Sequence, residues 1–343
     1  MSVKKELVNA VQVQSTNDAS IVSKCSMANS NYVRDDYVKH FVEKQKKRAP
    51  LIHLGYYTRS VIFSELLVKF IKYLHINKIL KFQIISCGSG FDTSYWRLSE
   101  DGLLSNSLFI EIDYPNVINR KLALINQSEK LRSVLHLKID ESSNVKKLNP
   151  NYFLLCADLC DIKMVESLLK DVNIDFDVPT LFLSECVITY MKEADSNRLI
   201  EWMSKKFKNS AFVNYEQIHP EDGFGEVMLR HFDKLQSSLN SVRTYPDCLS
   251  HKERYKLLGF EKSAVASEWD FLELLTTVDE RKRVLMLEQF DEFEEFHMKC
   301  THYVVAVAAN NALSAWPDQI NIMELYQYCE KAEFSLESAG EGF

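Results

Sequence analysis

The stretch that decides the fold is Gln83-Ile84-Ile85-Ser86-Cys87-Gly88-Ser89-Gly90-Phe91-Asp92-Thr93. An apolar run stops here at a Gly-x-Gly turn, and an amphipathic stretch follows the turn. The next strand-like run ends in Asp113. Glycines let the backbone approach a ligand closely, and an acidic residue at the tip of the next strand can accept hydrogen bonds from both hydroxyls of a ribose. The pattern predicts a site for an adenosine-containing ligand.

Strand-like and helix-like segments alternate through the middle of the chain. This alternation predicts βαβ units, and therefore an α/β fold with a mostly parallel sheet. We expect strands at 82–87, 107–112, 152–157, 179–185, 210–215, 261–267 and 303–308, and helices at 92–98, 115–126, 162–171 and 192–208.

The chain is expected to form one domain over residues 1–343, because it has only 9 glycines and 7 prolines and so little linker sequence. Residues 1–80 are expected to form an N-terminal tail, mobile at its start, and a helical lid. Within them, apolar spacing predicts one helix over 32–47, with a basic, solvated end at 44–48 and a stop at Ala49-Pro50, and another over 56–74. The sheet core is expected over 81–310, with a helical insertion near 222–258.

Composition excludes several functional classes. A net charge of -7 argues against general nucleic-acid binding, although a local basic patch can hide in an acidic protein. The chain has no apolar run of the roughly 18 residues that span a bilayer, and residues 1–14 lack the apolar core of a signal peptide. Its 8 cysteines are scattered, which predicts reduced thiols in a cytoplasmic protein. Cys156 and Cys160 have no matching second pair, so we expect no metal site.

Polar residues end each predicted strand of the core. Each has an ordinary alternative: the Gly-x-Gly can be a simple turn, Asp158 and Asp161 can cap the next helix, and Glu185 can be a buried structural acid. Ligands of doubly wound sheets bind beyond the carboxyl ends of the strands. Because several such residues fall at one edge of the sheet, we predict a cofactor cleft there.

The cleft favours S-adenosyl-L-methionine over a dinucleotide. A dinucleotide site prefers a third glycine in G-x-G-x-x-G, and this chain has Thr93 there. The chain also lacks a glycine cluster at a helix end that would suit a pyrophosphate. The cationic sulfonium of S-adenosylmethionine is compatible with nearby carboxylates. Its own carboxylate requires a cation, which Arg59 or Lys24 can supply.

With these residues placed, the sequence resembles the leucine carboxyl methyltransferase family over about residues 18–308. The motifs that carry the resemblance are Arg48-Ala49-Pro50-Leu51-Ile52-His53-Leu54-Gly55-Tyr56-Tyr57-Thr58-Arg59, Gly88-Ser89-Gly90-Phe91-Asp92-Thr93, Trp96-Arg97-Leu98, Ile110-Glu111-Ile112-Asp113-Tyr114-Pro115, Ala157-Asp158-Leu159, Glu185-Cys186-Val187 with Tyr190-Met191, Asn214-Tyr215-Glu216-Gln217, and Phe290-Asp291-Glu292 through His302-Tyr303.

The resemblance implies the methyltransferase fold, with a seven-stranded, mostly parallel sheet, an antiparallel last strand and extra N-terminal helices. It implies contacts to S-adenosyl-L-methionine, residue by residue. Arg59 and Lys24 would hold the methionine carboxylate, although the motif around Lys24 matches loosely and a mobile surface lysine is the alternative. Gly88 would pass under the methionine, Asp113 would bind the ribose, Asp158 and Leu159 would meet the adenine, and Glu185 would contact the amino group or line the cleft floor.

The resemblance also implies a substrate. The best-known members of the family methylate the C-terminal leucine carboxylate of the protein phosphatase 2A catalytic subunit, and we expect this chain to do so as a monomer, without nucleic-acid or membrane partners. The alternatives are a related O-methyltransferase for another carboxylate or a small molecule, and a non-catalytic binding module. Another branch of the family methylates a transfer-RNA base and carries a long C-terminal propeller, which we do not expect in a sequence that ends at Phe343.

The expected reaction needs no general base. A C-terminal carboxylate has a reference pKa of about 3.5 and is ionised at neutral pH, so the protein's work is positioning and desolvation. We therefore predict no catalytic histidine, and Tyr190 and Tyr215 either orient the acceptor or pack. The chain departs from the family at His53, Leu54 and Asp36, where Asn, Arg and Pro are usual, and Leu54 is expected to alter the peptide entrance.

Overall fold

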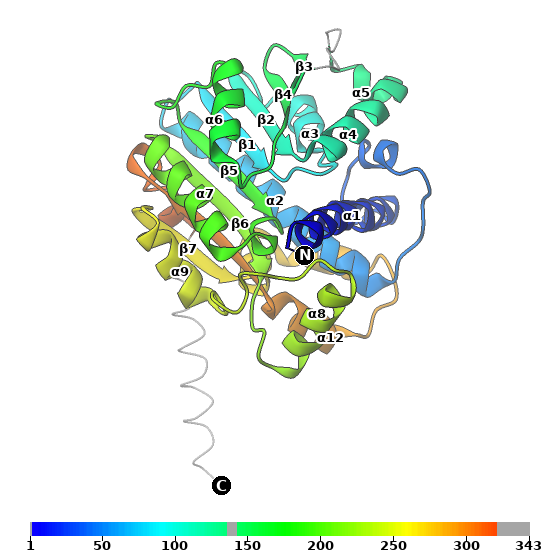
Figure 1. Cartoon of the computed structure of the whole chain (residues 1–343). Coiled ribbons are helices and arrows are strands. Elements are labelled where there is room, and N and C mark those ends of the chain that lie inside the picture. Colours follow the sequence, from blue (N-terminus) through cyan, green and yellow to red (C-terminus); the bar gives the residue numbers. More distant parts are fainter. Residues whose placement is uncertain (1, 136–142, 321–343) are drawn as a thin grey trace.

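An eight-stranded sheet forms the centre of the molecule in the computed structural model, which describes residues 2–135 and 143–320 (Figure 1). The strand order is β3-β4-β2-β1-β5-β6-β8-β7. Neighbours from β4 to β6 run parallel, β8 is antiparallel to β6 and β7, and β3 is antiparallel to β4. The strands are β1 Phe82–Cys87, β2 Ser107–Asp113, β3 Val145–Asn149, β4 Tyr152–Cys156, β5 Thr180–Glu185, β6 Ser210–Gln217, β7 Lys262–Ser267 and β8 Tyr303–Ala309.

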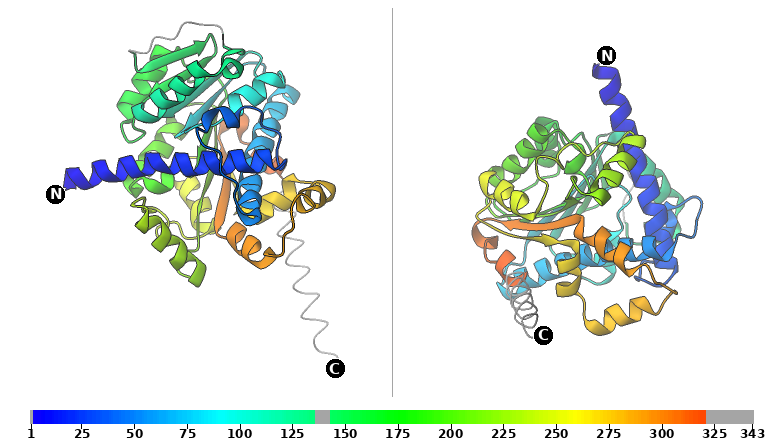
Figure 2. Two further views of the ribbon diagram at one scale, coloured as in Figure 1. Left: turned by 90° about the vertical axis from the view of Figure 1, so that its right-hand side faces the viewer. Right: turned by 90° about the horizontal axis from the view of Figure 1, so that it is seen from below.

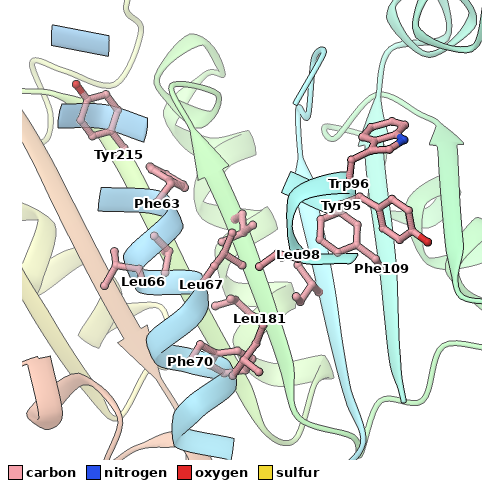
Figure 3. Close-up of a cluster of buried hydrophobic side chains, with 14 of the residues drawn as sticks. Phe63, Leu66, Leu67, Phe70, Tyr95, Trp96, Leu98, Phe109, Leu181 and Tyr215 are labelled. Atoms are coloured by element: carbon pink, nitrogen blue, oxygen red, sulfur yellow. The ribbon is translucent and has the colours of Figure 1, made fainter. Parts of the chain in front are cut away.

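Helices cover both faces of the sheet. Because successive residues of a strand point to opposite faces, neighbouring residues join different cores. Ile84 of β1 joins the core under α2 (Pro50–Ile76), α3 (Ser94–Glu100) and α4 (Pro115–Gln127). Its neighbour Ile85 joins the core under α6 (Ile162–Asp171), α7 (Glu193–Lys206) and α9 (Cys248–Leu257). Figure 3 shows the first core, where Phe63, Leu66, Leu67 and Phe70 of α2 lie near Leu181. The predicted α/β class and parallel centre are confirmed.

The remaining helices are short or lie toward the rim of the sheet. The part of the chain that the structure describes contains no helix both long enough and apolar enough to cross a bilayer. The expected helices of the 222–258 insertion are α8 and α9. The other elements are α5 Glu129–Arg132, α8 Gly223–Lys234, α10 Glu268–Leu275, α11 Val278–Leu285, α12 Phe293–Thr301, and the 3-10 turns η1 Val38–Phe41, η2 Ile188–Tyr190, η3 Asn311–Leu313 and η4 Pro317–Ile320.

The N-terminal segment is helical. It forms one long helix, α1 (Ser2–Asn29), whose first half extends away from the body of the molecule (Figure 2). The second half packs on α2 and buries Ile21 and Cys25. Composition alone did not indicate this helix, because the segment is polar and contains several serines and asparagines, which have low helix propensity.

The helix expected over 32–47 is wrong. Only the single 3-10 turn η1 forms there, and residues 42–49 contain no helix. The apolar residues face two separate clusters, since Tyr32 packs with Tyr57 whereas Tyr37 and Phe41 pack near Trp96. Asp35 also turns the chain, because its carboxylate accepts the N–H groups of the residues two and three positions later.

Pro50 begins a helix instead of ending one. It is the first residue of α2, where a proline is favoured because its missing N–H would have no helical partner. The helix therefore starts six residues before the expected position and includes His53 and Leu54. Leu54 is 2% exposed and packs in a buried cluster.

The eighth strand, β3, was not predicted and corrects the seven-stranded sheet. It holds Val145-Lys146-Lys147-Leu148-Asn149, in which lysines interrupt the apolar pattern. Leu148 is fully buried, while Lys147 is exposed on the edge of the sheet. Lysines are common on edge strands, where they oppose pairing with another chain, and this weakens the sequence signal of such strands.

Candidate functional site

A cavity of about 630 Å³ lies at the carboxyl ends of β1, β2, β4 and β5. Helix α1 lines it from one side through Asn17, Ser20 and Lys24, and α2 contributes Arg59. The cavity brings together all seven residues expected to contact a cofactor: Lys24, Arg59, Gly88, Asp113, Asp158, Leu159 and Glu185. Chain segments far apart in sequence therefore meet where doubly wound sheets bind their ligands.

The glycine turn after β1 cannot accept side chains. Gly88 and Gly90 have φ angles of 61° and 53°, which residues with a Cβ rarely adopt. A Cβ at Gly88 would lie 2.6 Å from both Cγ atoms of Val187, and one at Gly90 would lie 2.5 Å from Oδ1 of Asn17. The turn therefore leaves bare backbone beside the cavity, as the sequence predicted.

Asp113 ends β2 with its carboxylate at the rim of this turn. Oδ2 accepts the N–H of Gly90 at 2.7 Å, and Oδ1 accepts the N–H of Tyr114 at 2.7 Å. Burial raises the pKa of Asp113 to about 6, although these two N–H groups and the charge of Lys121 lower it. Each oxygen keeps a further lone pair, so the ionised group can accept both hydroxyls of a ribose.

Asp158 and Leu159 follow β4 at the other side of the turn. Asp158 is exposed, and its Oδ1 accepts the N–H of Cys160 at 2.9 Å. Leu159 is 7% exposed and lines the cavity, so it offers an apolar surface. The alternative role, capping of the next helix, applies to Asp161 and not to Asp158. Asp161 caps α6 by accepting the N–H of Met164 at 3.1 Å.

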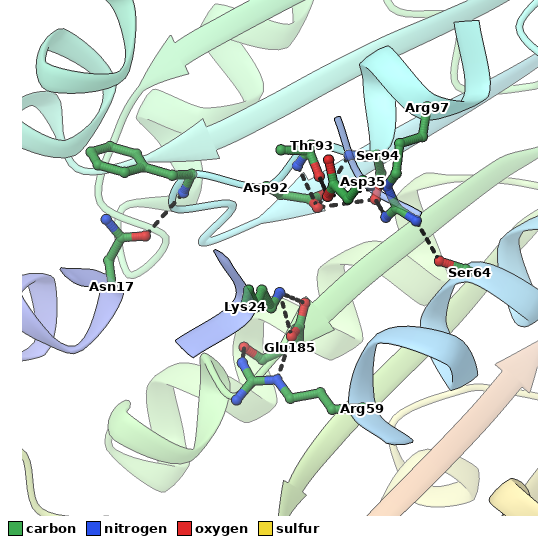
Figure 4. Close-up of polar contacts among 11 residues, drawn as sticks. Asn17, Lys24, Asp35, Arg59, Ser64, Asp92, Thr93, Ser94, Arg97 and Glu185 are labelled. Carbon is green, nitrogen blue, oxygen red and sulfur yellow. Dashed lines mark hydrogen bonds and ion pairs between the residues drawn. The ribbon is translucent and has the colours of Figure 1, made fainter. Parts of the chain in front are cut away.

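Two cations converge on Glu185 at the end of β5 (Figure 4). Lys24 Nζ lies 2.8 Å from Oε1 of Glu185, and the Arg59 guanidinium also pairs with Glu185 through Nε and with its backbone carbonyl through Nη2 at 3.3 Å. Burial raises the pKa of Glu185, but the charges of Arg59 and Lys24 outweigh it and hold the pKa at about 2. Lys24 is thus an ordered cavity residue and not a mobile surface lysine.

The guanidinium of Arg59 is held by two aromatic rings. Its Cζ lies 5.4 Å from the ring centre of Tyr215 and 5.7 Å from that of Tyr56. Tyr215 is 1% exposed and stacks on Tyr303 with ring centres 4.9 Å apart. Tyr215 therefore packs beneath Arg59, whereas Tyr190 lines the cavity.

Sequence reasoning missed Asp35 and Arg97, which also line the cavity. Thr93 Oγ1 donates to Oδ2 of Asp35 at 2.5 Å, and Arg97 Nε lies 3.7 Å from the same oxygen. Arg97 also donates to Ser64 Oγ of α2 at 2.7 Å (Figure 4). These contacts join the glycine turn to two N-terminal segments. Arg97 stands in a recognised motif, but neither residue carries a local signal of such long-range contacts.

The cavity that holds the cofactor residues also has apolar side chains in its lining. These include Tyr190, Phe232 and Leu235, together with the polar groups of Gln217 and Asn240. Asn240 Nδ2 donates to the carbonyl of Tyr190 at 2.7 Å and so joins the segment after α8 to the turn η2, which follows β5. Within the described residues, no group of three or more His, Cys, Asp or Glu is arranged to hold a metal ion.

The family follows from comparison with known proteins. A family model described as leucine carboxyl methyltransferase matches residues 3–204. The chain belongs to the leucine carboxyl methyltransferase family. It is 37% identical over 317 residues to the leucine carboxyl methyltransferase 1 homolog of Arabidopsis thaliana, covering 90% of this chain and 92% of that protein.

Another relative of this chain is named for a different activity. The chain is 37% identical over 309 residues to the tRNA wybutosine-synthesizing protein 4 of Rattus norvegicus, covering 89% of this chain but only 45% of that protein. A solved structure of a DUF574 family protein from Streptomyces avermitilis has a TM-score of 0.51 and 12% identity, over 85% of this chain and 97% of that chain. The structural likeness shows the α/β methyltransferase fold alone.

Family membership makes this chain a methyltransferase, and S-adenosyl-L-methionine is its cofactor. The residues of the cavity fit this cofactor on three observations: a glycine turn that a Cβ would obstruct, a carboxylate at the next strand tip, and two cations opposite them. The cofactor supplies the electrophilic methyl group. The chain supplies the surfaces that hold and orient the cofactor's adenosine and amino-acid ends.

Proposed function

We propose that this methyltransferase esterifies the C-terminal leucine carboxylate of the protein phosphatase 2A catalytic subunit. Three apolar lining residues carry the proposal, since Tyr190, Phe232 and Leu235 line the same cavity as the cofactor residues and offer apolar surface for a leucine side chain. Further support is the similarity to the Arabidopsis relative named leucine carboxyl methyltransferase 1 homolog, which extends over most of both chains.

In the proposed reaction the protein positions the reactants and excludes water. The acceptor carboxylate is ionised at neutral pH, and no residue has to remove a proton from it. Lys24 and Arg59 would hold the carboxylate of the cofactor, Asp113 its ribose, Asp158 and Leu159 its adenine, and Glu185 its amino group. The apolar side chains that line the cavity would remove water from a weak nucleophile and align it with the methyl group.

We further propose that the enzyme is a monomer in the cytoplasm, acting on a protein tail. The 7 described cysteines are all free thiols, which suits a reducing compartment. An RNA acceptor is the second candidate, because the relative named for wybutosine synthesis is as similar in identity as the Arabidopsis protein. A different carboxylate or a small molecule remains the alternative acceptor within the same reaction class.

Methyl transfer from labelled S-adenosylmethionine separates these acceptors. The purified phosphatase catalytic subunit should take up label that mild base removes, and a variant of it without the terminal leucine should take up none. Transfer RNA, offered in parallel, should remain unlabelled. Label on the RNA alone, or on the truncated phosphatase, would contradict the proposed substrate.

A further inference from the structure

The contact between α1 and α2 contains a buried polar chain that lies outside the cofactor cavity. Ser26 Oγ of α1 lies 2.7 Å from Nε2 of His53 on α2. Nδ1 of the same imidazole lies 2.5 Å from Oε2 of Glu288, in the loop between α11 and α12. His53 is completely buried and Ser26 is 6% exposed. Three separate segments therefore meet through one ring.

Every polar side-chain atom of this Ser26–His53–Glu288 network has a partner when His53 carries its proton on Nδ1. Ser26 Oγ accepts the backbone N–H of Arg48 at 2.9 Å, which leaves its own hydrogen to donate to Nε2 of His53. Nδ1–H then donates to Glu288. Full satisfaction matters here because an unpaired buried polar atom costs about 1–3 kcal/mol.

Glu288 also contacts residues next to the end of α1 and the start of α2. The hydroxyl of Tyr32, just after α1, donates to its Oε2 at 3.2 Å, and Lys47, just before α2, lies 3.1 Å from Oε1. The ring of Tyr32 also lies 5.4 Å from that of His53 between ring centres. The carboxylate thus ties the end of α1 and the start of α2 to one loop.

A serine, a histidine and a glutamate in this order are also the components of a nucleophilic triad. Here the serine hydroxyl is buried and accepts a backbone N–H, and neither Ser26 nor His53 lines the cofactor cavity. A substrate bound in that cavity has no contact with Ser26. The arrangement is therefore suited to holding helices and not to covalent chemistry.

The site depends on how these helices are held. Lys24 of α1 and Arg59 of α2 both reach Glu185 of β5. Ser26 stands two residues after Lys24, on a different face of α1, and His53 stands six residues before Arg59 on α2. A shift of one helix along the other would move the two cations apart at the cofactor.

We propose that Ser26, His53 and Glu288 are positioning residues, which set α1 against α2 so that Lys24 reaches the carboxylate end of the cofactor site. This inference rests on the role assigned above to Lys24. It concerns cofactor binding alone, so it does not depend on which acceptor is methylated.

A double-mutant cycle on S-adenosylmethionine affinity tests the proposal by calorimetry with the full chain, well below its unfolding temperature. Ser26→Ala should weaken binding by about tenfold, as expected for one displaced charge-assisted contact. Lys24→Ala should also weaken it, and Ser26→Ala should cause no further loss in the Lys24→Ala background, because Ser26 acts through Lys24.

Ser23→Ala is the matched control. Ser23 is a buried serine of the same helix, but its Oγ donates only to the carbonyl of Ala19 at 2.9 Å, so its removal should leave cofactor affinity unchanged. If Ser26→Ala does not fold, Glu288→Gln replaces it in the cycle, since it keeps the side-chain volume.

Three results would overturn the proposal. A folded Ser26→Ala variant that binds as tightly as Ser23→Ala would show that the chain does not position the site. Losses that simply multiply in the double variant would show a general structural effect. If Lys24→Ala alone binds normally, the assignment of Lys24 to the cofactor fails, and the positioning role fails with it.

Discussion

The two ends of the cofactor site are built in different ways. At the glycine end, Gly88, Gly90 and Asp113 are placed by backbone turns at neighbouring strand tips. At the cation end, Lys24 and Arg59 come from two helices and reach a carboxylate 161 and 126 residues away in sequence. The first end depends on local geometry, whereas the second depends on helix packing.

Replacing Asp113 should have the largest effect on binding. Asp113→Ala removes the acceptor of both ribose hydroxyls, at about 1.5–3 kcal/mol for each hydrogen bond, so cofactor affinity should fall at least about 100-fold. Asp161→Ala is the control, because Asp161 only caps α6. If calorimetry finds equal cofactor affinities for the two variants, Asp113 does not bind the ribose, and the glycine end does not determine cofactor affinity.

Gly88→Ala tests the rigidity of the glycine end through stability. Its positive φ should cost about 1–2 kcal/mol, and the contact with Val187 should add about 1–3 kcal/mol in urea unfolding. Gly102→Ala has a similar φ of 69° and nothing within 4 Å of its Cβ, so it should show the first cost alone. Adding Val187→Ala to Gly88→Ala should recover part of the extra stability that Gly88→Ala loses relative to Gly102→Ala. If no stability is recovered, the contact with Val187 is not the cause of that loss.

Arg59→Lys probes the cation end with the charge retained. Lysine lacks the planar fork that pairs with Glu185 and lies near Tyr215, so cofactor affinity should fall about tenfold. The loss should exceed that of the same change at Arg120, an exposed arginine that pairs with Asp18. An Arg59→Lys variant with unchanged affinity would mean that charge alone matters there.

Acidification should weaken the glycine end first. Burial raises the pKa of Asp113 to about 6, whereas Arg59 and Lys24 hold the pKa of Glu185 at about 2. Ribose hydroxyls bind the ionised carboxylate, so below pH 6 cofactor affinity should drop by about tenfold per pH unit as Asp113 takes up a proton. Titration calorimetry from pH 7.5 to 5 should show this slope, and Asp113→Asn should abolish it. A slope that persists in Asp113→Asn would show that a group other than Asp113 takes up the proton.

Asp158→Asn should have the smallest effect. Its carboxylate is exposed and screened by solvent, and its contact with the N–H of Cys160 survives in an amide. Cofactor affinity should change by no more than about threefold. A loss comparable to that of Asp113→Ala would place the adenine end among the determinants of binding.

The expectations that held were those carried by repeated local patterns. Seven strands lie within a few residues of their predicted positions, because apolar runs bounded by turns mark buried parallel strands. The errors arose where local pattern and packing disagree. The apolar residues of 32–47 face two clusters, and β3 is an edge strand with a weak apolar alternation.

For the site, the sequence by itself determined the glycine turn and the acidic tip of the following strand. These depend on backbone conformation, which a few neighbouring residues decide. Only the tertiary structure decided that Lys24 and Arg59 share Glu185, that Asp35 and Arg97 support the turn, and that His53 joins Ser26 to Glu288. These contacts join side chains far apart in sequence, and they exist only once α1 and α2 are packed against the sheet.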